Sequence, residues 1–194
     1  MRAAVFIRYH SGDGFGHVAW AFETGDGRVD AGSVENHSGH LFTPASKMGF
    51  WNGMFDDPVA PMRAHGYDDL KWIDVPDADP LLAYRTVLWI EHEAYKALHR
   101  NCEDDAYDVL RAFGVKDLAP PSFMWFPKSW FRRFRGTLEH ADTYRWGSAP
   151  RSMPHDDNDD GDQTPWQPTW RRPLHADFHA LHLERLVKLA TGRA

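Results

Sequence analysis

The chain of 194 residues contains a single cysteine, Cys102, which excludes an internal disulfide and a cysteine-rich zinc site. No apolar run approaches the roughly 18 residues that cross a membrane. The opening MRAAVFIRYH also lacks the long apolar segment of a signal peptide. Positive charge is scarce, since 22 Lys and Arg oppose 28 Asp and Glu, and this argues against nucleic acid as a partner. The sequence therefore predicts a soluble, cytoplasmic protein.

Apolar residues are plentiful, at 42% of the chain with nine Trp and twelve Phe, which is enough for a sizeable core. The first half has the pattern of an antiparallel sheet, with strands expected at residues 3–10, 17–23, 28–36 and 67–76. Gly25, Asp26 and Gly27 suit a hairpin turn between the second and third strands. Residues 36–66 show little periodicity, and we expect a long loop there.

Two helices are expected next. Asp79 can cap the first, Pro80 suits its first position, and apolar residues recur at helical spacing through His99. The second spans residues 103–113, with Asn101 as a candidate cap before it and Gly114 as its C-cap. The predicted fold class is α+β, with the sheet packed on the helix that starts at the cysteine.

The composition changes after residue 122. We expect a core at residues 1–122, an aromatic and basic extension at 123–150, an acidic linker at 151–165 and a C-terminal helix at 166–194. The extension alternates aromatic residues with Lys and Arg, a pattern that can also lie at a membrane surface. We favour packing on the core by its aromatic residues Trp125, Phe126, Trp130 and Phe131, with the arginines facing water.

Two further patterns suggest metal ligands, but no metal is expected. His175, His179 and His182 share one ridge of the C-terminal helix, yet no nearby acid or cysteine completes a ligand set. Residues 156–167 imitate a calcium loop, but Gln167 stands where the loop needs a bidentate Glu. The sequence thus predicts no cofactor.

Cys102 follows a candidate helix cap, where free backbone N–H groups favour a thiolate. The alternative is a small buried side chain, because free cysteines are among the most buried residues. Three acids, Glu103, Asp104 and Asp105, follow Cys102. They complement the helix dipole, and we expect them to face water, where they oppose a thiolate least.

The stretch NCEDDAYDVLRAFG, with GHVAWAFE upstream, resembles the circularly permuted NlpC/P60, papain-like thiol hydrolases. Within this group it is similar to the LRAT-like enzymes, which carry an NCEHF signature, and to the PPPDE peptidases. The resemblance covers roughly residues 17–114. It implies a permuted papain-like fold in which a histidine-bearing strand precedes the cysteine helix. Cys102 would be the nucleophile, and His17 would be its base and later the acid that protonates the leaving group.

A third residue would orient the imidazole. If the hairpin turn is tight, Glu23 faces Arg28, and the even-numbered residues of the following strand share the His17 face. This leaves Asn36 and Asp30, and we prefer Asn36 because it lies nearer the position opposite His17. A bulge near Gly32 would shift the parity and promote Glu35.

The expected function is a cysteine-dependent hydrolase that cleaves an amide, isopeptide or ester bond of a peptide or other substrate through an acyl-enzyme. An LRAT-like acyltransferase or phospholipase acting on lipids is the first alternative. The second is a non-catalytic interaction module that keeps the fold.

Overall fold

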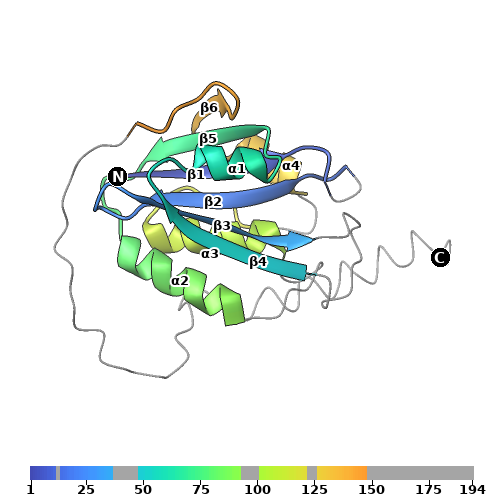
Figure 1. The fold of residues 1–194 in the computed structure, drawn as a ribbon. Helices are drawn as coiled ribbons and strands as arrows, with labels where there is room; N and C mark the ends of the chain where they lie inside the picture. The colour runs from blue at the N-terminus through green and yellow to red at the C-terminus, as the bar shows by residue number, and fades with distance from the viewer. Residues whose placement is uncertain (12–13, 37–47, 93–100, 122–125, 148–194) are drawn as a thin grey trace, which may run out of the picture.

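The computed structural model describes residues 1–11, 14–36, 48–92, 101–121 and 126–147, and its fold is α+β. A six-stranded antiparallel sheet has the order β4-β3-β2-β1-β5-β6 (Figure 1). The strands are β1 (Arg2–Arg8), β2 (His17–Glu23), β3 (Val29–Asn36), β4 (Met48–Phe55), β5 (Asp69–Asp74) and β6 (Thr137–His140). The helices are α1 (Val59–Ala64), α2 (Pro80–His92), α3 (Cys102–Phe113) and α4 (Pro127–Arg133).

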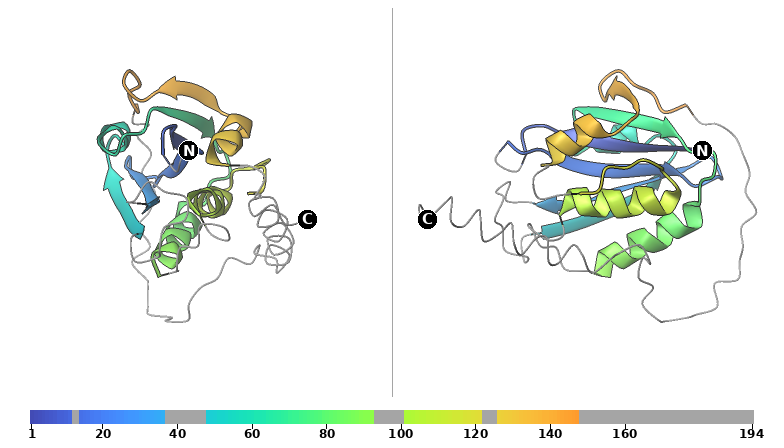
Figure 2. Two further views of the ribbon diagram at one scale, coloured as in Figure 1. Left: turned by 90° about the vertical axis from the view of Figure 1, so that its right-hand side faces the viewer. Right: turned by 180° about the vertical axis from the view of Figure 1, so that it is seen from behind.

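Both faces of the sheet are covered. Strand β1 is flanked by β2 and β5, and its residues from Ala3 to Ile7 are fully buried. Alternate side chains of a strand point to opposite faces, so an uninterrupted apolar strand needs cover on both sides. Helices α2 and α3 lie against one face and α1 lies against the other (Figure 2). The apolar character of β1 is explained by this double burial.

Helix α3 begins and ends where its capping residues predict. The Asn101 side chain accepts hydrogen bonds from the backbone N–H groups of Glu103 and Asp104, and the Asp104 carboxylate accepts one from the Asn101 N–H. Gly114 ends the helix in the left-handed conformation, with φ of 106°. In α2, the side chain of Asp79 accepts a hydrogen bond from the Leu82 N–H. These caps confirm the starts of both helices.

The register of the β2–β3 hairpin differs from the prediction. Glu23 lies opposite Val29 rather than Arg28, and the pairing continues to Trp20 opposite Gly32. The connection is one residue longer than expected, because Arg28 belongs to the turn and its carbonyl accepts a hydrogen bond from the Thr24 N–H. A shift of one residue exchanges the two faces of a strand. Odd-numbered positions of β3 therefore share the face of His17, and the predicted even-numbered parity is wrong.

Several elements were not predicted from the sequence. The expected loop at residues 36–66 is wrong over β4 and α1, whose segments are MGFWNGMF and VAPMRA. Gly49, Asn52 and Gly53 interrupt β4 and hide the alternation by which strands are recognised. Strand β4 is held by its pairing with β3, and α1 by the packing of Val59 and Met62 in the core, rather than by a sequence pattern of their own.

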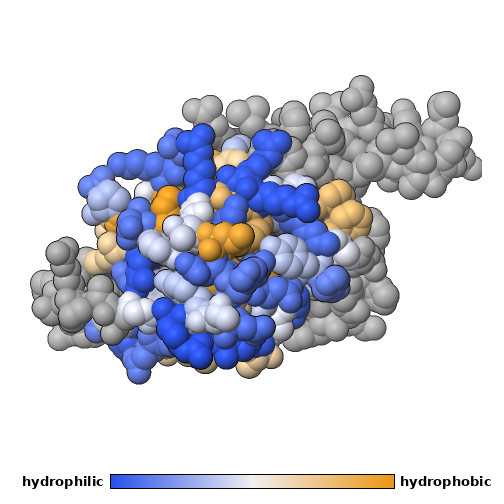
Figure 3. Space-filling view, turned by 90° about the horizontal axis from the view of Figure 1, so that it is seen from above, coloured by the Kyte–Doolittle hydropathy of each residue, from blue (hydrophilic) through white to orange (hydrophobic). Residues whose placement is uncertain are grey.

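Residues 126–147 belong to the same folded unit as the rest. Strand β6 pairs with β5, and Trp130 and Phe131 of α4 are buried in the core. The neighbouring Arg132 and Arg133 are exposed, as predicted. The face that Figure 3 shows is mostly hydrophilic, with small, separated apolar areas. Trp125, the acidic linker, the C-terminal helix and both candidate metal patterns lie outside the described residues.

Candidate functional site

Cys102 and His17 lie at the same end of the sheet. His17 is the first residue of β2, and Cys102 is the first residue of α3, which packs on β2 and β3 (Figure 1). Each residue is only 4% exposed. The fold thus brings together two residues that are 85 positions apart in the sequence.

Cys102 lies near enough to His17 for its side chain and charge to act on the imidazole. Burial by itself lowers the pKa of His17, because it disfavours the charged ring. The interactions of His17 with Cys102 and with the carboxylate of Glu35 outweigh burial and raise the pKa of His17 to about 9. A protonated imidazole beside a cysteine favours the thiolate over the thiol, and the thiolate is the form in which a cysteine acts as a nucleophile.

Ser33 determines which ring nitrogen keeps its hydrogen when the His17 imidazole is neutral. Its hydroxyl donates to the backbone carbonyl of Val18 at 3.1 Å, and its oxygen lies 2.9 Å from Nε2 of His17. A hydroxyl has a single hydrogen to donate, so at this second contact the Ser33 oxygen accepts and Nε2 donates. Nδ1 is therefore the ring nitrogen left to exchange a proton with the thiol.

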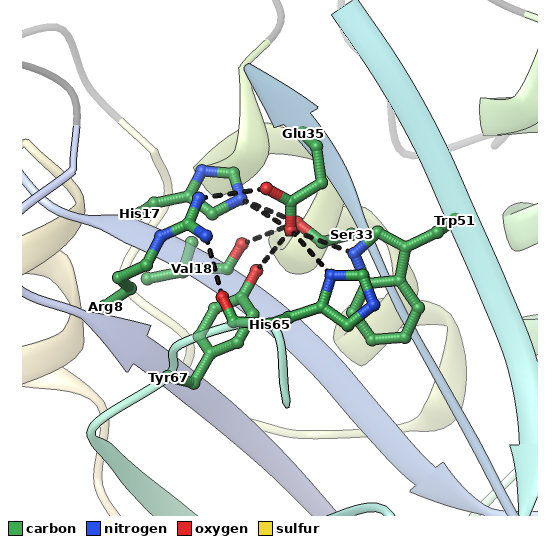
Figure 4. A network of polar contacts seen from close by, with 8 residues as sticks. All are labelled: Arg8, His17, Val18, Ser33, Glu35, Trp51, His65 and Tyr67. Carbon is green, nitrogen blue, oxygen red and sulfur yellow. Dashed lines mark hydrogen bonds and ion pairs between the residues drawn. The ribbon is translucent and has the colours of Figure 1, made fainter. Parts of the chain in front are cut away.

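Glu35 supports the same nitrogen and is held from several sides (Figure 4). Its Oε1 lies 3.6 Å from His17 Nε2 and accepts hydrogen bonds from the indole of Trp51 at 2.9 Å and the hydroxyl of Tyr67 at 3.2 Å. Its Oε2 pairs with the guanidinium of Arg8 at 2.9 Å. These donors leave the carboxylate little freedom to rotate.

The electrostatics of Glu35 follow from these contacts. Burial raises its pKa, but the imidazolium of His17, Arg8 and the indole of Trp51 act in the opposite direction and hold the pKa well below its usual range. Burial and the charge of Glu35 together raise the pKa of Tyr67 well above 10. Glu35 therefore stays ionised and Tyr67 stays protonated over the whole physiological pH range.

The other candidates for the third residue are placed differently. Asp30 lies on the opposite face of β3, where its Oδ2 accepts a hydrogen bond from Asn52 at 3.2 Å and Trp20 is close by. Burial raises the pKa of Asp30 to about 6. Asn36 ends β3 opposite Met48, and its side chain lies outside the described part. Of the three candidates, Glu35 is the one whose contact with His17 the structure describes.

The start of α3 also offers an oxyanion donor. The Asn101 side chain engages the N–H groups of Glu103 and Asp104, and no described residue accepts a hydrogen bond from the Cys102 N–H. The expectation that all three acids face water is wrong, because Glu103 and Asp105 are 2% and 1% exposed. Asp104 is instead used in the cap.

Sequence reasoning missed the residues that surround Glu35. Arg8 ends β1 opposite His17, Trp51 comes from the unpredicted β4, and Tyr67 stands just before β5. Each acts through the tertiary arrangement of strands, and no short motif contains them. Ser33 is an odd-numbered residue of β3, so only the correct register of the β2–β3 hairpin could have placed it on the face of His17.

The described residues contain no group of three His, Cys, Asp or Glu side chains that could hold a metal ion. None of the described helices is long and apolar enough to cross a membrane. No protein-family model, curated protein or solved structure matches this chain.

Proposed function

We propose that the chain is a cysteine-dependent hydrolase of the permuted papain-like, NlpC/P60 type, with Cys102 as nucleophile and His17 as base. The observation that carries the proposal is the contact of the thiol with an imidazole whose Nε2 is already engaged by Ser33 and Glu35. Support also comes from the chain order, in which a histidine-bearing strand precedes the cysteine helix. Glu35 takes the orienting role in place of Asn36.

In the first half-reaction the Cys102 thiolate attacks the substrate carbonyl carbon, and the carbonyl electron pair moves onto oxygen. The Cys102 N–H donates a hydrogen bond to this oxyanion. As the tetrahedral intermediate collapses, the bond to the leaving amine or alkoxide breaks. His17 gives its Nδ1 proton to that leaving group, and a thioester remains on Cys102.

In the second half-reaction His17 Nδ1 takes a proton from water, and the resulting hydroxide attacks the thioester. The carboxylic acid leaves and the thiolate returns beside the imidazolium. Through both halves Glu35 keeps the ring oriented and stabilises its charged form, which is the role of the third member of such triads. An alcohol or amine in place of water gives acyl transfer by the same steps.

The test is to trap the acyl-enzyme. The purified chain is incubated with p-nitrophenyl acetate, and intact-mass and peptide mass spectrometry locate the acetyl group. We expect a transient acetyl group on Cys102 that is lost in His17→Ala and in Cys102→Ala, whereas Asp26→Ala, in the exposed β2–β3 turn, retains it. A native protein in which Cys102 is not acetylated contradicts the proposal and favours the interaction module. An added alcohol acceptor separates transfer from hydrolysis.

A further inference from the structure

Arg8 occupies a fixed position beside the candidate site. It ends β1 directly opposite His17 in the β1–β2 register. One terminal nitrogen of its guanidinium pairs with Glu35 Oε2 at 2.9 Å, and the other donates to the backbone carbonyl of His65 at 2.7 Å. The guanidinium also lies over the ring of Tyr67, 5.5 Å from its centroid. Three partners, Glu35 on β3 and His65 and Tyr67 in the connection between α1 and β5, therefore fix its orientation (Figure 4).

The two oxygens of Glu35 have different partners. Oε2 belongs to Arg8, whereas Oε1 faces His17 and receives the neutral donors Trp51 and Tyr67. A buried carboxylate with no cation beside it would act on the imidazole with its full charge, because little water is present to screen it. Arg8 and Glu35 instead form a pair with no net charge.

We propose that Arg8 is a positioning residue that holds the Glu35 carboxylate by Oε2 and limits the negative charge that Glu35 presents to His17. The inference rests on the proposed function in one respect, namely that His17 serves as both base and acid. An imidazolium stabilised too strongly gives up its proton slowly, and the leaving group must receive that proton. Arg8 thus lets an ionised glutamate orient and stabilise the imidazolium of His17 without holding its proton too strongly for transfer to the leaving group.

Substitution of Arg8 leaves in place every other titratable group around His17 and Glu35. Cys102 and Glu35 act on His17 directly, Tyr67 donates to Glu35, and His65 Nδ1 lies 3.9 Å from Glu35 Oε1. On α3, the helix packed against β2 and β3, the buried acids are Glu103, Asp105 and Asp108. A change on removal of Arg8 alone is therefore assigned to Arg8 and its pairing with Glu35.

The experiment is an NMR titration of the His17 imidazole in a Cys102→Ala background, which removes the thiolate and makes the result independent of nucleophilic activity. We expect Arg8→Met to raise the pKa of His17 by about one unit. The matched control is Arg28→Met, which removes the same charge from an exposed pair with Asp26. The control should leave the pKa of His17 unchanged.

A pKa of His17 that stays constant or falls in Arg8→Met overturns the inference, because a merely structural loss of Glu35 contacts would weaken the imidazolium. If Arg8→Met does not fold, Arg8→Lys replaces it. One ammonium group cannot reproduce the planar contacts to both Glu35 and His65, so a smaller rise is expected and no rise contradicts the inference. Failure of the acyl-enzyme test would leave this titration unaffected, so the two outcomes can be told apart.

Discussion

Glu35→Gln isolates the charge of Glu35 while keeping an oxygen that can accept from Trp51 and Tyr67. Opposite unit charges 3.6 Å apart attract by about 4–5 kcal/mol at an effective dielectric constant of about 20. Arg8, at 2.9 Å from the other oxygen, offsets much of this attraction. We expect a net loss of roughly 1.5–3 kcal/mol for the imidazolium, which lowers the pKa of His17 by about one to two units.

The measurement combines an NMR titration of His17 with the rate at which iodoacetamide alkylates Cys102 at pH 7. The proton that leaves the thiol has to remain on His17, so a weaker imidazolium reduces the thiolate fraction. The alkylation rate should therefore fall by about tenfold or more, following about 1.4 kcal/mol per factor of ten. His17→Ala should slow the reaction further, because it removes the proton acceptor.

Two variants serve as controls. Asp30→Asn removes a buried carboxylate from the opposite face of the same strand, and it should leave the pKa of His17 and the alkylation rate unchanged. Asn36→Ala tests the residue that the sequence favoured. A loss of reactivity in Asn36→Ala with none in Glu35→Gln would refute the assignment of Glu35.

The contact between His17 and Glu35 also makes the folding stability depend on pH. The pKa of His17 in the folded chain is about 9, above its unfolded value of about 6.5. A group whose pKa is raised by folding stabilises the native state fully below the unfolded pKa, and this stabilisation is lost as pH rises through the folded pKa. Urea unfolding of the wild type should show this loss between about pH 6.5 and 9. In Glu35→Gln the loss should end at a lower pH, because the pKa of His17 in the folded chain is lower.

Three further predictions concern folding stability. Burial raises the pKa of Asp30 to about 6 from 3.8, so ionising Asp30 costs folding stability as pH rises through that range. Asp30→Asn should therefore raise the melting temperature at pH 8 and not at pH 4. Equal effects at both pH values would contradict this. Asn101→Ala removes the capping box of α3 and should cost about 1–2 kcal/mol in urea unfolding, whereas a loss below experimental error would mean that the cap contributes nothing. Gly114→Ala should cost more than about 1 kcal/mol, because φ is 106° and a Cβ would lie 2.7 Å from the Asp77 carbonyl; a stabilised variant would contradict the reported conformation.

Local patterns were sufficient for the elements with strong end signals. Asp79 and Pro80 mark the start of α2, and Asn101 and Gly114 delimit α3. Runs of apolar residues mark β1 and β2, and the turn at residues 24–27 marks where β3 follows. Packing, rather than pattern, decided β4, and its glycines concealed it.

The candidate site depended on finer information. The sequence could propose Cys102 and His17, because each belongs to a short motif. The third residue depended on whether Arg28 belongs to the turn or to the strand, and that single residue exchanges the faces of β3. The donors that hold Glu35 come from β1, β4 and the segment before β5, so only the assembled sheet could reveal them.

The separation of His17 and Cys102 along the chain has a consequence for folding. The contact of His17 with Cys102 requires β2 to be in the sheet and α3 to be docked on that sheet. The contact therefore closes a long loop, and it forms only when many other contacts between distant parts of the sequence are in place. On a ribosome, β1 and β2 emerge well before α3, and the thiol meets its imidazole only after that helix has packed. A partly folded chain therefore presents Cys102 without its histidine neighbour. If Cys102 is the nucleophile that we propose, its fast alkylation at neutral pH would therefore follow the last stage of folding, after the protein around it is complete.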